Sequence, residues 1–181
     1  MAKMVGKIPT DIWFTKNARH LTRLIEIIFG VIWLIDSSFK FQAYFESQFS
    51  NLLAAAAQGQ PQWLQGWFYW WAALTSSDPH AFAFAIGILE LSLGIGLVLG
   101  LMRKIAYGGG FVLSMVIWTV PEGFGGPYGP SSTDIGTGAI YAIAFVLLAL
   151  INALAGRSEY TLDSFLSKKI KWWKKLADIK Y

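Results

Sequence analysis

Ionisable side chains inside long apolar stretches are the residues of this sequence best placed to do chemistry. Glu90 lies in the middle of one such stretch, and Asp36 and Lys40 lie four residues apart near the end of another. An ionised group inside a membrane costs about 3 kcal/mol or more unless it is paired or hydrated. Glu90 is therefore either a proton carrier or a neutral, packed acid that meets Lys40 or Tyr141 of another helix. Asp36 and Lys40 either serve a function or form an intrahelical ion pair.

A segment rich in glycine and proline is the second candidate for chemistry. Residues 121–130 contain four glycines and three prolines. Glycine permits positive φ and close backbone approach, whereas proline stiffens the chain. The composition therefore predicts a rigid loop that presents backbone N–H groups, Glu122 and Tyr128 in a fixed shape. A tight turn between two helices is the alternative interpretation.

The residue types exclude several classes of cofactor. The chain has no cysteine, so it forms no disulfide, thiolate nucleophile or Cys-ligated iron–sulfur or zinc site. His20 and His80 belong to segments that we place on opposite sides of a membrane, so they cannot ligate one haem together. We expect no haem, flavin or metal to be bound by this chain alone. A cation site made by Asp78, His80, Glu122 and Asp134 has no specific spacing to support it.

Four apolar stretches must position these groups. Each is close to the length of about 20 helical residues that crosses a hydrocarbon core of roughly 30 Å. They cover about residues 21–41, 81–102, 105–120 and 134–155. The prediction is a single all-α membrane domain over residues 1–181, built as a bundle of four transmembrane helices. Ala83, Gly87, Glu90 and Gly94 share one helix face, which predicts that Glu90 packs against a neighbouring helix and not against lipid.

The distribution of basic residues predicts the topology. Lys and Arg are absent between Phe41 and Met102 and between Ile105 and Gly156. The positive-inside rule then places both termini in the cytoplasm of a multi-pass plasma-membrane protein, with Arg103 or Lys104 available as an interfacial anchor. This pattern is typical of a protein that contacts membrane lipid, and it does not indicate a nucleic-acid partner.

Two further segments are predicted to be helical. The outer loop, residues 42–80, reads as two helical pieces separated by Gly59-Gln60-Pro61. Six of the nine residues in 63–71 are aromatic, which predicts either an interfacial anchor or a wall for a flat ring such as a quinone. The tail, residues 158–181, predicts a basic amphipathic helix on the inner leaflet.

The longest distinctive motif is Trp118-TVPEGFGGPYGPSSTDIGTGAI-Tyr141. Together with Gly30, Lys40-Phe41 and a layout of four spans with a long first outer loop, it resembles the DoxX/DoxD membrane proteins. The resemblance extends from about Arg19 to Gly156. It is nearest to the DoxD type, the membrane subunits of archaeal thiosulfate:quinone oxidoreductases.

This resemblance implies a function and its partners. It implies oxidation of thiosulfate to tetrathionate with a membrane quinone as the diffusible electron acceptor, and a DoxA-like small subunit as partner. It also implies an alternative, in which the chain is a non-catalytic accessory subunit of an archaeal aa3-type terminal quinol oxidase with haem–copper subunits.

The candidate site residues come from the physical arguments and not from the resemblance. We assign Glu90 and Asp36 to proton transfer. The expected thiosulfate-binding residues share polarity and an outer position: Lys40, His80, Glu122, Tyr128 and Asp134. The expected quinone-binding residues are the aromatic side chains Trp33, Trp118 and Tyr141.

Overall fold

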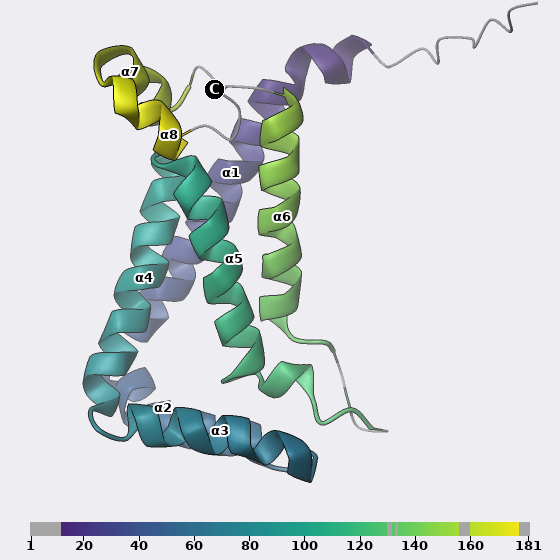
Figure 1. The fold of residues 1–181 in the computed structure, drawn as a ribbon, viewed down its shortest axis with the longest axis vertical. Helices are drawn as coiled ribbons and strands as arrows, with labels where there is room; N and C mark the ends of the chain where they lie inside the picture. The colour runs from purple at the N-terminus through teal and green to yellow at the C-terminus, as the bar shows by residue number, and fades with distance from the viewer. Residues whose placement is uncertain (1–11, 130–131, 133, 156–159, 178–181) are drawn as a thin grey trace, which may run out of the picture.

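Helices form all the secondary structure in the part of the chain that this computed structural model describes, residues 12–129, 132, 134–155 and 160–177. Figure 1 shows their arrangement. In chain order the elements are α1 (Ile12–Lys40), α2 (Ala43–Ala57), α3 (Gln62–Thr75), α4 (Pro79–Leu99), α5 (Arg103–Thr119), the 3-10 helix η1 (Gly123–Gly125), α6 (Thr137–Ala155), α7 (Leu162–Lys169), the 3-10 helix η2 (Lys171–Trp173) and α8 (Lys174–Ala177). The all-α prediction is confirmed for these residues.

The four long helices correspond to the four predicted apolar stretches, with differences at their ends. α1 begins at Ile12 and not near residue 21, and α6 begins at Thr137 and not at 134. The first turn of α6 is capped by a residue distant in sequence, because the Glu122 carboxylate accepts a hydrogen bond of 2.9 Å from the Gly138 N–H group. In the outer loop, α2 and α3 confirm the two predicted helical pieces.

The long helices form two extensively packed pairs, α1 with α4 and α5 with α6. In Figure 1, α4 and α5 meet at the end near α7 and α8 and diverge toward the opposite end, where α2 and α3 lie across the bundle. The two pairs are therefore held together at one end and splayed at the other.

Glycines allow the close approach within each pair. A Cβ atom added at Gly94 would lie 2.8 Å from the Leu34 side chain and 3.0 Å from the Gly30 carbonyl oxygen. Between α5 and α6, a Cβ atom at Gly138 would lie 2.7 Å from the backbone of both Ser114 and Trp118. The prediction that the small-residue face of α4 packs against another helix is confirmed, because this face contacts α1.

An aromatic core joins the two pairs near the middle of the bundle. Trp33 and Phe145 are fully buried, and Phe29 and Tyr141 pack against them. The ring centroids of Phe29 and Phe145 are 4.9 Å apart, and those of Trp33 and Tyr141 are 5.5 Å apart. These contacts link α1 to α6.

The outer surfaces of the long helices are apolar. Within the described residues, Pro79–Leu99 and Thr137–Leu154 are each long and apolar enough to cross a membrane. Only 33% and 28% of the residues in their most apolar portions are buried inside the protein. The core helix of a soluble protein is mostly buried, so these exposed apolar surfaces are compatible with a membrane environment.

A polar cluster is buried where α4 and α5 meet. Nη1 of Arg23 lies 3.0 Å from Glu26 Oε2, and the Tyr107 hydroxyl donates a hydrogen bond to the same carboxylate. Arg103 is 1% exposed, and its Nη1 lies 3.8 Å from Glu26 Oε1. The expectation that Arg103 could reach the interface as an anchor is therefore wrong, because its charge is neutralised inside the protein. Lys104, the alternative anchor, is exposed.

The tail folds back on the bundle as two short helices and not as one continuous helix. Ile170 has extended backbone angles, φ −122° and ψ 108°, which end α7. Trp173 and Ala177 turn inward and are buried. The lysines of the predicted basic face are all exposed: Lys168, Lys169, Lys171, Lys174 and Lys175. The two ends of the predicted tail, residues 158–159 and 178–181, lie outside the described residues.

Candidate functional site

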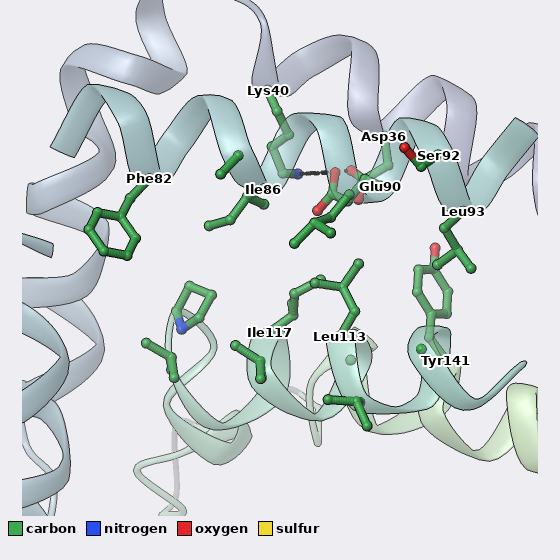
Figure 2. A pocket seen from close by; sticks show the side chains of 18 of the residues that line it. Asp36, Lys40, Phe82, Ile86, Glu90, Ser92, Leu93, Leu113, Ile117 and Tyr141 are labelled. Atoms are coloured by element: carbon green, nitrogen blue, oxygen red, sulfur yellow. Dashed lines mark hydrogen bonds and ion pairs between the residues drawn. The ribbon is translucent and has the colours of Figure 1, made fainter. Parts of the chain in front are cut away.

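A large cavity of about 1310 Å³ lies between the two diverging helix pairs. α4 and α5 supply most of its wall, and side chains from α1, α2, α3 and α6 complete it. Figure 2 shows Phe82, Ile86 and Leu93 on one side of this space and Leu113 and Ile117 on the other. The wall is mainly apolar, and ligand pockets of this kind usually measure about 300–1,000 Å³. The cavity is therefore large enough for an apolar ligand of considerable size.

Three charged groups meet at the wall of this cavity. Glu90 is fully buried, and its Oε2 lies 3.6 Å from Lys40 Nζ. The same ammonium lies 3.3 Å from Asp36 Oδ1 and 5.3 Å from the centroid of the Phe45 ring. Figure 2 shows the Lys40 side chain extending toward Glu90, with Asp36 beside them. We call Asp36, Lys40 and Glu90 the acid–lysine cluster.

The close packing of α1 on α4 brings the cluster together. Lys40 is the last residue of α1, and Gly87 lies one turn before Glu90 on α4. A Cβ atom at Gly87 would lie only 3.2 Å from Lys40 Cβ and 3.0 Å from the Phe41 ring. The absence of a side chain at this position lets the end of α1 approach α4, so that the Lys40 side chain reaches the carboxylate.

Glu90 retains unused hydrogen-bonding capacity. Neither of its carboxylate oxygens has a hydrogen-bond partner among the residues that the structure describes. A buried acceptor without a hydrogen bond costs about 1–3 kcal/mol, and more when it is charged. The ion pair with Lys40 offsets part of this cost, and a ligand O–H group in the cavity would offset the rest. The cluster can thus accept a proton at Glu90 and donate a hydrogen bond from Lys40.

Of the other predicted site residues, Tyr141 and Glu122 also line the cavity. Figure 2 shows the Tyr141 ring standing at the end of the cavity near Leu93. The Glu122 carboxylate is already engaged by the N-terminal turn of α6. Of the two partners predicted for Glu90, Lys40 makes the contact, because its Nζ lies 3.6 Å from Glu90 Oε2. Tyr141 donates no hydrogen bond to this carboxylate.

The remaining residues of the predicted thiosulfate site are not brought to this cavity. His80 is exposed at the start of α4, and its Nε2 lies 3.5 Å from Glu46 Oε1. Tyr128 donates a hydrogen bond of 2.6 Å to the Phe124 carbonyl, and Asp134 accepts one of 2.7 Å from the Gly136 N–H group. Within the described residues, none of these three side chains lines the cavity. Pro130, at the end of the predicted rigid loop, lies outside the described residues.

Two of the three predicted quinone-binding aromatics do not line the cavity. Trp33 is fully buried in the aromatic core. Trp118 donates a hydrogen bond of 2.7 Å from Nε1 to the Ile135 carbonyl and packs against Phe124. Among the described residues, the cavity lining includes Tyr141 but neither tryptophan.

Several lining residues were not among the predicted site residues. Phe45 of α2, Ser92 of α4 and the pair Gly108 and Gly109 of α5 line the cavity. Trp71 of α3 also lines it, and this residue belongs to the aromatic segment 63–71, for which a quinone wall was one of the two interpretations. A periodic pattern was available for α4, because Ala85, Leu89 and Ser92 recur at spacings of four and three. Nothing local in the sequence marks Phe45, since its place depends on how α2 folds across the bundle.

Comparisons with known proteins identify no relative. No protein-family model, curated protein or solved structure matches this chain. Within the described residues, no group of three or more His, Cys, Asp or Glu side chains is arranged to hold a metal ion. The features that bear on function are therefore the cavity, the acid–lysine cluster and the resemblance of the 118–141 motif.

Proposed function

We propose that this chain is the quinone-binding membrane subunit of a thiosulfate:quinone oxidoreductase. The observation that carries the proposal is the fully buried Glu90 carboxylate, paired with Lys40 at the wall of a large apolar cavity. A quinone needs an apolar cavity for its ring and polar groups for its oxygens, with a proton source beside them. The resemblance to DoxD-type proteins supplies thiosulfate as the electron donor.

The proposal includes a plasma-membrane protein with four spans, α1, α4, α5 and α6, and with both termini in the cytoplasm. Seventeen residues make α5 about 26 Å long, which is close to the thickness of the hydrocarbon core. The outward surface of α1 is formed by apolar residues that are about half exposed: Leu24, Ile25, Ile28, Ile35 and Phe39. Its charged residues Arg23 and Glu26 are buried instead. This distribution, with apolar groups outside and charged groups inside, suits lipid as the surrounding medium.

The overall reaction balances in electrons and protons. Two thiosulfate ions each lose one electron and join through a new sulfur–sulfur bond to form tetrathionate. The quinone takes up these two electrons and two protons to become the quinol. Glu90 supplies protons to the reduced ring oxygen, and Lys40 and Asp36 restore them from the partly exposed side of the acid–lysine cluster.

The charge of the cluster argues against binding thiosulfate there. Lys40 faces two carboxylates, and His80 faces Glu46, so both of the expected cationic groups already have acidic neighbours. A dianion would be repelled by this arrangement. We therefore assign thiosulfate binding to a partner, the DoxA-like small subunit, and quinone binding to this chain.

To test this function, the protein is purified from native membranes in mild detergent and assayed for thiosulfate-dependent reduction of a quinone analogue. A haem spectrum and identification of every co-purifying chain accompany the assay. We expect activity in a haem-free preparation that contains this chain and a small partner. Haem-containing partners without thiosulfate activity would instead identify an accessory subunit of a terminal quinol oxidase.

Variants then connect activity to the cavity. Glu90→Gln removes the proton-accepting group with little change of shape, so we expect turnover to fall about 100-fold. The matched control is Glu46→Gln, because that carboxylate is exposed and does not line the cavity. Normal turnover in the Glu90→Gln variant would remove Glu90 from the mechanism.

A further inference from the structure

The cavity is open on one side, between α4 and α5. On α4 and α5, four residues of its lining are also large exposed apolar side chains: Leu89 at 56%, Ile95 at 41%, Ile105 at 50% and Val112 at 59%. A side chain that both lines a cavity and is half exposed lies at its mouth. These residues belong to the middle of α4 and to the first three turns of α5, so the mouth opens sideways through the bundle.

Two glycines leave a gap in the α5 side of this mouth. Gly108 and Gly109 line the cavity and are exposed, and a Cβ atom at either position would meet nothing within 4 Å. They lie three or four residues from Ile105 and Val112, which places all four residues on one side of the helix. The next residue, Gly110, differs because it packs against the Phe145 ring. The two glycines therefore leave open space that packing within this chain does not fill.

The polar end of the cavity indicates what would occupy that space. Glu90 is fully buried and accepts no hydrogen bond within the described residues, and Lys40 beside it is a hydrogen-bond donor. A carbonyl oxygen on a ligand would accept a hydrogen bond from Lys40, and after reduction its O–H group would donate one to Glu90. The apolar wall suits a long apolar body behind this polar head. The volume of about 1310 Å³ exceeds that of most pockets for compact ligands, which leaves room for such a body.

We infer that the gap at Gly108 and Gly109, flanked by Leu89, Ile95, Ile105 and Val112, is a lateral portal for a long-tailed lipid quinone. The quinone enters from the hydrocarbon between α4 and α5, its ring reaches Glu90 and Lys40, and its tail remains in the portal. This inference depends on the proposed quinone-binding function. It adds that the substrate class is a quinone with a long apolar tail and that it arrives from the bilayer and not from water.

The test compares a portal variant with a matched control. Gly109→Leu fills the gap, and Gly66→Leu places the same side chain on α3, where nothing lies within 4 Å and no cavity residue is changed. Binding is measured in lipid nanodiscs with two probes, a polyprenyl benzoquinone and the tail-less tetramethylbenzoquinone. Thermal unfolding of each variant reports whether the fold is retained.

We expect Gly109→Leu to weaken binding of the long-tailed quinone about tenfold and to leave the tail-less probe within about twofold. Gly66→Leu should alter neither. Equal weakening of both probes, or no effect of Gly109→Leu on either, would overturn the portal. If the wild-type protein turns over normally and Gly109→Leu binds both probes as the wild type does, the portal is rejected and the proposed function is retained. Tail-selective binding without thiosulfate-dependent turnover would retain the portal and reject the proposed function. A wild-type chain that binds neither probe would reject both the portal and the proposed function.

Discussion

The ammonium of Lys40 lies 3.6 Å from the carboxylate of Glu90 and thereby joins the end of α1 to the middle of α4. The same ammonium lies 3.3 Å from Asp36. One cation thus serves two carboxylates, of which one is fully buried and the other is partly exposed. Because each charge is held by its neighbours, the cluster is expected to respond as a unit when one member is changed.

Replacing Lys40 with methionine should destabilise the protein. The substitution leaves the Glu90 carboxylate buried without its cation, and breaking a buried pair in this way costs about 3–5 kcal/mol. Thermal unfolding in detergent would measure the loss.

The double variant Lys40→Met, Glu90→Gln provides the control for this first prediction. It removes both charges, so it should recover most of the stability and still lack quinone reduction. A double variant no more stable than Lys40→Met alone would show that Lys40 acts through packing and not through charge.

Asp163 should be essential for holding the tail on the bundle. Its Oδ1 accepts hydrogen bonds of 2.8 Å from the Met102 N–H group and from Trp173 Nε1, and its Oδ2 accepts one of 3.0 Å from the Arg103 N–H group. Asp163→Ala removes all three and leaves the buried Arg103 guanidinium without one of its carboxylates. We expect a loss of about 3–5 kcal/mol.

Limited proteolysis of the tail would check this second prediction, with Trp173→Phe as the graded comparison. That variant removes one hydrogen bond and keeps the aromatic ring, so its cost should be about 1 kcal/mol. Equal protease resistance of wild type and Asp163→Ala would show that Asp163 does not hold the tail on the bundle.

Gly138→Ala should force α5 and α6 apart. The new Cβ atom would lie 2.7 Å from the backbone of both Ser114 and Trp118, and backbone atoms cannot move aside as a flexible side chain can. Overpacking of this kind costs about 1–3 kcal/mol. Gly66→Ala on exposed α3 is the matched control, and it should be neutral or stabilising by up to about 1 kcal/mol because alanine favours helix. A midpoint of thermal unfolding that is the same in both variants would argue against the close packing.

The proposed topology predicts opposite labelling of two single cysteines. The natural chain has no cysteine, so each introduced thiol is the sole target. Ser77 and Lys104 are both exposed; Ser77 lies in the turn before α4, and Lys104 lies in the first turn of α5. In intact cells, a membrane-impermeant maleimide should label Ser77→Cys at once and Lys104→Cys only after permeabilisation. Labelling of both positions from outside would disprove the four-span arrangement with cytoplasmic termini.

Features that depend on neighbouring residues were accessible from the sequence. The positions of the long helices follow from apolar stretches, and the break between α2 and α3 follows from Gly59 and Pro61. The small-residue face around Gly87 and Gly94 identified Glu90 as a buried group before its partner was known. The first residue of α6 was harder to predict, because the N-terminal turn of this helix is capped by Glu122, which is distant in sequence from Thr137.

The sequence by itself determined which segments are helical and which ionisable groups require partners, because hydropathy, glycine and proline act over a few residues. Only the tertiary structure decided which residues pair with these ionisable groups. Arg103, expected as a possible surface anchor, lies beside Glu26 and Asp163, since α5 and the tail converge there. Lys40 reaches Glu90 because α1 packs closely on α4, and the cavity exists because α5 diverges from α4. Such long-range contacts depend on how helices cross, and helix crossing is a property of the whole packed bundle and not of any single stretch.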